Sequence, residues 1–215
     1  MKTRLLLLSA LLVAGAFAPV KAATITVLNP GFEAPVVGDP NSTGTATSWT
    51  GVNVGGAPGV YDPPVTVYPT VPEGVQVAYA QGGSSLSQLL GANETANTLY
   101  TLRVFVGRRL DQTSGPQAYT IQLLAGATTL INSVTPIMPA AGTFAEVVLN
   151  FTSPSSVAAS QQLQVRLIGS SVTPQTNFDN VRLDANVVPT PSAALGGLAL
   201  LGLMAAGTKL KSRMM

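Results

Sequence analysis

The stretch Leu163-Gln164-Val165-Arg166-Leu167 alternates apolar and polar side chains without a break. A period of two puts the three apolar residues on one face of a β-strand and the two polar residues on the other. Residues 119–123 and 147–151 also carry apolar side chains at every second position. Strands with one apolar face are typical of antiparallel sheets that pack against each other.

Similar β-rich runs recur along the chain, separated by glycine, proline, asparagine or serine. They cover residues 24–28, 65–68, 75–80, 99–106, 119–124, 146–151, 163–168 and 178–183, while 84–90 fits a strand or a short helix equally well. We therefore predict one all-β domain, an antiparallel jelly-roll sandwich over residues 23–186. Residues 34–72 are rich in proline and glycine, and such long loops commonly carry function. We expect the single tryptophan, Trp49, to lie in the core.

The N-terminus has the three parts of a secretory signal peptide. Lys2 and Arg4 precede the apolar run 5–17, and Val20-Lys21-Ala22 supplies a cleavage site. We predict removal of residues 1–22 and export across the inner membrane. An uncleaved membrane anchor is the alternative.

The C-terminal segment 187–215 also has three parts. Pro189 and Pro191 end the preceding fold, residues 193–207 are apolar and uncharged, and Lys209, Lys211 and Arg213 form a basic end. A short apolar helix followed by cations predicts a membrane helix with its basic end in the cytoplasm. At ~1.5 Å per residue it is short for the ~30 Å hydrocarbon layer. A buried C-terminal core helix is the alternative.

This tail, with Val188-Pro189-Thr190-Pro191 before the apolar run, resembles the PEP-CTERM sorting signal of Gram-negative bacteria. Thr190 stands where the usual motif has glutamate, and lysine partly replaces arginine. The resemblance implies processing by an exosortase-like membrane transpeptidase. It also implies transient anchoring in the membrane and a final location at the cell surface or outside the cell.

Composition excludes several kinds of chemistry. Residues 23–186 hold five arginines, no lysine and nine carboxylates, a formal charge of −4, so the basic pI of 9.1 comes from the two ends. This composition argues against nucleic-acid binding. The chain has no cysteine and no histidine, which excludes disulfides, Cys/His zinc sites and Ser-His-Asp triads. We therefore predict a protein that is not an enzyme.

Two motifs frame the middle domain, Leu28-Asn29-Pro30-Gly31-Phe32-Glu33 and Asn177-Phe178-Asp179-Asn180-Val181. Together they resemble the galactose-binding-like sandwich of carbohydrate-binding modules. The resemblance implies the sandwich fold and a structural calcium, with Glu33 and Asp179 at the positions of its carboxylate ligands. The alternative is that both carboxylates accept backbone N–H bonds at turns.

Sugar binding needs flat aromatic faces and a few polar groups. Tyr61 and Tyr68 with Arg108 and Arg109 are the candidate ligand-binding residues. The predicted function is a non-catalytic, exported surface or matrix protein that binds polysaccharide. One alternative is a structural or adhesive matrix protein without a ligand. The other is a secreted hydrolase, which we disfavour because no pair of acids has a diagnostic spacing.

Overall fold

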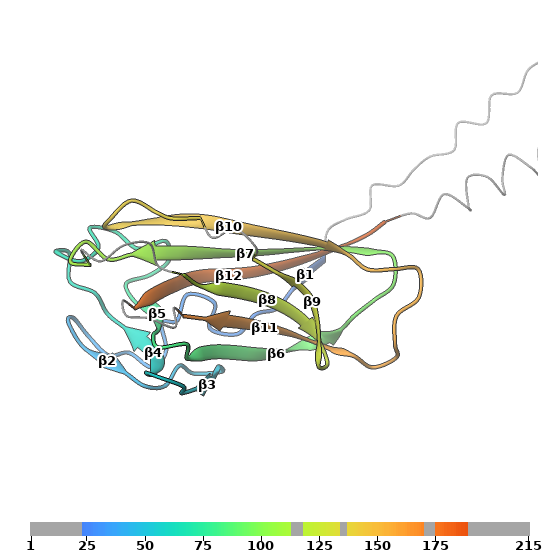
Figure 1. Ribbon diagram of the computed structural model, residues 1–215, viewed down its shortest axis with the longest axis horizontal. Helices are drawn as coiled ribbons and strands as arrows, with labels where there is room; N and C mark the ends of the chain where they lie inside the picture. The colour runs from blue at the N-terminus through green and yellow to red at the C-terminus, as the bar shows by residue number, and fades with distance from the viewer. Residues whose placement is uncertain (1–22, 113–117, 134–136, 170–174, 189–215) are drawn as a thin grey trace, which may run out of the picture.

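The computed structural model describes residues 23–112, 118–133, 137–169 and 175–188 of the chain. Within these residues the chain forms twelve β-strands and no helix (Figure 1). The strands are β1 (Ala23–Ile25), β2 (Ser42–Thr43), β3 (Thr50–Val52), β4 (Pro58–Tyr61), β5 (Val77–Ala80), β6 (Ser85–Asn93), β7 (Thr98–Arg108), β8 (Thr120–Ala125), β9 (Thr128–Asn132), β10 (Thr143–Thr152), β11 (Gln162–Ile168) and β12 (Thr176–Val187).

The strands build two antiparallel sheets. The larger sheet has the order β10-β7-β12-β5-β4-β2, and β1 adds to β12. The smaller has the order β3-β6-β11-β8-β9. The sheets lie face to face, with β10, β7 and β12 running side by side along one of them (Figure 1). The predicted all-β, antiparallel fold class is therefore confirmed.

The core lies between the sheets, and the period-two pattern locates it. Leu163, Val165 and Leu167 of β11 are fully buried, as the alternation predicted. Phe178 and other inward side chains of the larger sheet pack in the same cluster. Trp49 also belongs to this cluster, with its ring 5.0 Å from that of Phe32. The expectation that the tryptophan is a core residue holds.

The prediction of a strand at 65–68 is wrong. The backbone N–H groups of Val67 and Tyr68 both donate to the Pro64 carbonyl, at 2.8 and 3.1 Å, so the chain turns here. The apolar side chains that suggested a strand instead form a second, smaller core with β4 and β5. Its buried members are Tyr61, Val67, Tyr68, Val77 and Tyr79. The ambiguous run 84–90 is a strand, part of β6.

Candidate active site

A pocket of about 440 Å³ opens on the face of β10, β7 and β12 that points away from the core. Its volume lies within the range of small-molecule sites, roughly 300–1,000 Å³. The lining combines two aromatic rings, a short apolar segment and several polar groups: Thr70, Val71, Pro72, Phe105, Gly142, Thr143, Phe144, Asn180 and Arg182.

Strand register explains why these side chains share a face. Glu146 of β10, Phe105 of β7 and Asp179 of β12 lie opposite one another in a row across the three strands. Opposite residues of paired strands point to the same side of a sheet. The intervening residues Val104 and Val147 point into the core, so the row faces outward. Asp179 is therefore a neighbour of the pocket ring Phe105.

The segment after β4 forms one wall of the pocket. The Tyr68 ring packs on Phe144, with the ring centres 4.6 Å apart, and its hydroxyl donates to Asn177 at 3.0 Å. Gly107 makes this approach possible, because a Cβ there would lie 2.8 Å from the Tyr68 hydroxyl. Beyond Tyr68 the chain reaches Glu73, whose backbone N–H donates to Asp179 at 2.9 Å.

Asp179 is the most perturbed acid of this site. Its side chain is fully buried and accepts N–H bonds from Glu73 and from Asn180, the latter at 2.7 Å. Burial is the main cause that raises the pKa of Asp179 to about 8; the two N–H donors lower it, and the nearby carboxylates of Glu73 and Glu33 add to the increase. A pKa in this range suits a group that gives up a proton near neutral pH.

Arg103 and Arg182 lie opposite each other in the next outward row, beside Glu146. Glu146 forms ion pairs with Arg182 and with Arg103, the latter at 3.7 Å. The Arg182 guanidinium carbon also lies 5.9 Å from the centre of the Phe105 ring. Two cations and one anion therefore border the aromatic part of the pocket.

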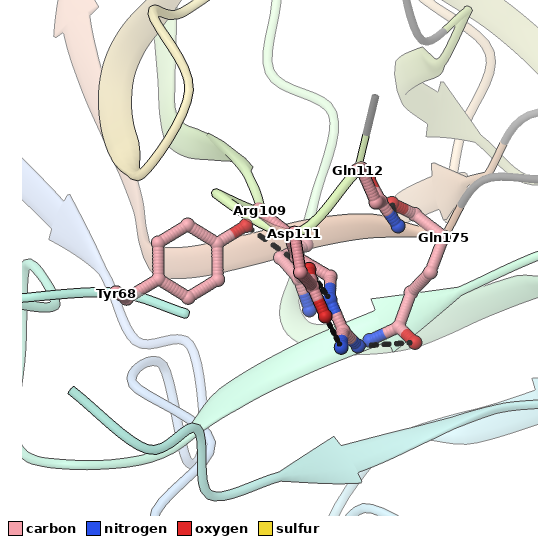
Figure 2. A network of polar contacts seen from close by, with 6 residues as sticks. Tyr68, Arg109, Asp111, Gln112 and Gln175 are labelled. Carbon is pink, nitrogen blue, oxygen red and sulfur yellow. Dashed lines mark hydrogen bonds and ion pairs between the residues drawn. The ribbon is translucent and has the colours of Figure 1, made fainter. Parts of the chain in front are cut away.

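A second polar cluster lies where β7 ends, and Figure 2 shows Arg109 between Asp111 and Gln175. Arg109 donates to both carboxylate oxygens of Asp111, at 2.9 and 2.7 Å, and its guanidinium lies 5.1 Å from the Tyr61 ring centre. The hydrogen bond with Arg109 lowers the pKa of Asp111. Such a bidentate pair fixes the position of the loop that follows β7.

Three of the four predicted ligand-binding residues come together in this cluster: Tyr61, Tyr68 and Arg109. Both tyrosine rings are buried, at 8% and 2% exposure, and face protein. Arg108 is the neighbour of Arg109, and its Nε is buried without a hydrogen-bond partner in the described part of the chain. A role for these four residues in ligand contact stays a prediction.

The two predicted calcium ligands accept backbone N–H groups, as the alternative expected, and a calcium shared between them stays a prediction. Glu33 Oε1 accepts the N–H groups of Val75 and Gln76, at 3.0 and 2.9 Å, while Asp179 accepts those of Glu73 and Asn180. N–H donors thus stand where a cation would need free oxygens. Across residues 23–112, 118–133, 137–169 and 175–188, no three acidic, histidine or cysteine side chains form a group that could hold a metal ion.

Most of the predicted sorting tail lies outside the described residues. This applies to Pro189, Thr190, Pro191, the apolar run 193–207 and the basic residues Lys209, Lys211 and Arg213. Val188 is described, and its N–H donates to the Asn97 carbonyl at 2.7 Å. Among the residues that are placed, none belongs to a helix of the length and apolarity that crossing a bilayer requires.

Sequence reasoning missed the pocket residues Phe105, Phe144 and Arg182, and also Glu146, which pairs with Arg182. One signal was available, since Phe105 alternates with the buried Val104 and Val106 and so is an aromatic ring on the polar side of its strand. No sequence pattern indicated that residues 70–73 would fold over that same side.

Comparison with known proteins identifies a relationship over the whole described domain. The family model HpiC1-like, described as HpiC1 cyclase, matches residues 23–184. The Stig cyclase Fisc from Fischerella sp. TAU, solved in complex with (3Z)-3-(1-methyl-2-pyrrolidinylidene)-3H-indole, is 28% identical with a TM-score of 0.70. That match covers 79% of this chain and 100% of that chain.

A cyclase from Fischerella sp. TAU in complex with 4-(1H-indol-3-yl)butan-2-one is 28% identical with a TM-score of 0.68, covering 78% of this chain and 100% of that chain. An arabinose-bound α-L-arabinofuranosidase, MgGH51, matches at 14% identity and a TM-score of 0.55, covering 77% of this chain and 27% of that chain. At that identity the likeness concerns the fold alone. No curated protein matches the chain.

These matches overturn the recognition made from the sequence. The related proteins are cyclases bound to small indole compounds, not PEP-CTERM matrix proteins or carbohydrate-binding modules. An exosortase, a polysaccharide and a membrane are therefore withdrawn as partners.

The interpretation as a non-catalytic protein is also wrong. It treated the lack of histidine and cysteine as a lack of catalytic groups, whereas a buried aspartate can supply acid chemistry. The two framing motifs lie within the residues that match the cyclase family.

Proposed function

Because the chain belongs to the HpiC1-like family, we propose that it is a cyclase acting on a small indole-containing molecule bound in the pocket of β7, β10 and β12. A cyclase joins two parts of one substrate. Its site has to hold the substrate folded and to start the reaction. The pocket offers groups for both tasks.

Binding is the task of the two phenylalanines. Phe105 and Phe144 present aromatic surface to the pocket, and an indole can stack on such rings or meet them edge-on, gaining ~0.5–1.5 kcal/mol per ring pair beyond area burial. The relatives from Fischerella sp. TAU bind two different indole compounds, which supports indole as the substrate class.

Acid catalysis is the task of Asp179. A carboxyl group with a pKa of about 8 can give its proton to an electron-rich indole carbon. The resulting cation is attacked by a double bond of the same molecule, which forms the new ring bond, and loss of a proton returns the acid. No proton is gained or lost overall, so the product is an isomer of the substrate. Because Asp179 is fully buried, the wall segment at Pro72 and Glu73 has to shift for the proton to reach the substrate.

The observation that carries the proposal is the position of the fully buried Asp179 opposite Phe105 on the neighbouring strand. Calorimetry with 4-(1H-indol-3-yl)butan-2-one tests the binding half. We expect binding to the wild type, and a loss of tenfold or more in Phe105→Ala. A matched control is Phe151→Ala, which removes a ring from the opposite side of the same sheet. Equal binding by wild type and Phe105→Ala would contradict the assigned pocket.

Hydrogen–deuterium exchange tests the acid. In D₂O, reversible protonation of the bound indole replaces ring-carbon hydrogen by deuterium, which NMR detects. We expect exchange to be faster than in buffer and to fall above pH 8, where Asp179 ionises. Asp179→Asn is expected to bind the ketone and lose the catalysed exchange. Undiminished exchange in that variant would assign the proton to another group.

A calcium held by Glu33 and Asp179 competes with this role, because a calcium ligand has to be ionised. Burial favours the protonated form of Asp179 against the lowering effect of its two N–H donors, and we derive no step through calcium. Elemental analysis and the thermal midpoint in chelator test the alternative. Bound calcium whose removal lowers the midpoint of the wild type and leaves Asp179→Asn unchanged would assign this carboxylate to the metal.

We also propose an organisation for the chain as a whole. Residues 1–22 are a signal peptide, 23–188 form the cyclase domain with a jelly-roll connection of its strands, and 189–215 are a separate tail; the domain extends two residues past the expected boundary at 186 because β12 ends at Val187 and Val188 bonds to Asn97. The leader pattern of Lys2, Arg4 and the run 5–17 supports export across the inner membrane. The N-terminal sequence of the mature protein tests the first boundary.

A further inference from the structure

An excess of positive charge borders the aromatic part of the pocket. Arg103, Glu146 and Arg182 occupy neighbouring outward positions on β7, β10 and β12. One glutamate is shared by two arginines, so the trio carries a formal charge of +1. Among the described residues, neither arginine forms an ion pair with a second carboxylate. Asp179 lies in the row of Glu146 and Phe105, but it is fully buried and bonded to the N–H groups of Glu73 and Asn180.

The position of Arg182 relates this charge to a bound ligand. Arg182 lines the pocket, and its guanidinium lies 5.9 Å from the Phe105 ring centre. Its side chain is 45% exposed, so it is accessible to a ligand from solvent. An arginine has five N–H donors in a planar fork, and a single carboxylate partner occupies two of them at most. Arg182 therefore keeps N–H donors that can bind a polar group of a ligand stacked on Phe105.

We propose that this pocket selects indole substrates with a carboxylate side arm, which Arg182 binds while the indole ring lies against Phe105 and Phe144. The inference rests on the proposed function and names its substrate class more closely. A carboxylate matches the guanidinium fork in geometry and charge. A neutral arm leaves the excess charge uncompensated.

In this arrangement Glu146 weakens the binding of an anionic ligand, whereas Arg182 strengthens it. It competes with the ligand for the Arg182 guanidinium and reduces the local charge from +2 to +1. Neutralising Glu146 is therefore expected to strengthen binding of an anion, while neutralising Arg182 weakens it. A purely structural ion pair predicts instead that both substitutions weaken binding of every ligand to the same degree.

Two small molecules of the same shape distinguish the effect of ligand charge on binding from the effect of ligand shape. 4-(1H-indol-3-yl)butan-2-one and 3-(1H-indol-3-yl)propanoic acid have the same skeleton, and the methyl group of the ketone is an oxygen in the acid. Calorimetry at low salt measures Kd for both with the wild type, Arg182→Gln, Glu146→Gln and the control Arg166→Gln. Arg166 lies on β11 of the other sheet, and its removal changes the overall charge as Arg182→Gln does.

We expect the wild type and Arg166→Gln to bind the acid about tenfold more tightly than the ketone. Arg182→Gln is expected to lose this preference and keep its affinity for the ketone, while Glu146→Gln increases the preference. High salt should reduce the preference, because exposed charges are screened.

Equal Kd values for acid and ketone in the wild type would overturn the inference and leave the proposed function intact. A loss of both ligands by the same factor in Arg182→Gln would also overturn it, because that result indicates a structural role. If neither ligand binds the wild type, the proposed indole function fails as well. Should Arg182→Gln fail to fold, Glu146→Gln decides, since only the inference predicts a gain of affinity for the acid alone.

Discussion

At the scale of single residues, Asp179 couples the stability of the domain to pH. Its pKa is about 8 in the folded chain and ~3.9 in an unfolded one. The folded state therefore binds the proton more tightly between these values. The contribution of Asp179 is fully present below pH ~4 and is lost as the pH rises through about 8, with a slope of up to ~1.4 kcal/mol per pH unit.

We expect this slope in the free energy of unfolding measured with urea between pH 5 and pH 9. Asp179→Asn does not titrate, so the variant should lack that part of the pH dependence while the other acids contribute equally to both proteins. The difference between the two curves is the relevant quantity. Parallel curves for wild type and variant would show that Asp179 has an ordinary pKa.

The close packing of the pocket wall can be tested by substituting two glycines, Gly107 in contact with the wall and Gly91 away from it. A Cβ at Gly107 would lie 2.8 Å from the Tyr68 hydroxyl and close to the Phe144 ring, whereas one at Gly91 meets nothing within 4 Å. We expect Gly107→Ala to cost ~1–3 kcal/mol through overpacking and to weaken ketone binding, since Tyr68 and Phe144 have to move apart. Gly91→Ala should be neutral or slightly stabilising. Equal thermal midpoints for the two variants would contradict this account of the wall.

At the scale of elements, two buried glutamines hold the proline-rich segment in place. Gln76 donates to the carbonyls of Phe32 and Pro35, both at 3.0 Å, and accepts the N–H of Val37 at 2.7 Å. Gln88 bonds in the same way to both backbone groups of Leu28 and to the carbonyl of Ser48. Side chains thus replace the strand partners that this irregular backbone lacks.

Gln76→Leu leaves three backbone groups without partners in a buried place. Each buried group that loses its hydrogen bond costs ~1–3 kcal/mol, so we expect a loss of at least ~3 kcal/mol in urea unfolding. Gln164→Leu on the outer side of β11 is the control, and a change within about 0.5 kcal/mol is expected there. A mild effect of Gln76→Leu would mean that water replaces the lost bonds.

The same elements show what a sequence can predict. Long strands with strict alternation, such as β7, β10 and β11, follow from side-chain period alone, because one face of each is buried. Strands β2, β3 and β4 are short and have no such pattern, and their pairing depends on partners distant in the sequence. The pocket was missed for a related reason. Phe105, Phe144 and Arg182 are brought together by strand register across three strands, and register cannot be read from any one of them.

At the scale of the whole molecule, the first and last strands close the domain. Ala23 pairs with Ala185 and Ile25 with Leu183 in the β1–β12 ladder, and the Thr24 hydroxyl donates to Asp184 at 3.1 Å. All described pairs of this ladder lie after the expected signal-peptide cleavage site. Cleavage after Ala22 would leave these pairs in place, and mass spectrometry of exported protein should find Ala23 at the N-terminus. Retention of residues 1–22 in exported material would contradict the prediction of a cleaved signal peptide.

The boundaries of the domain predict which fragment of the chain folds and binds on its own. A fragment of residues 23–188 contains both sheets, the pocket and the contact of Val188 with Asn97. It should fold alone, unfold in one cooperative transition and bind 4-(1H-indol-3-yl)butan-2-one as the longer chain does, because it contains every residue that lines the pocket. A fragment that starts at Val27 lacks β1 and exposes the edge of β12, so we expect a lower thermal midpoint or aggregation. Equal midpoints for the two fragments would show that β1 contributes nothing to closing the sandwich.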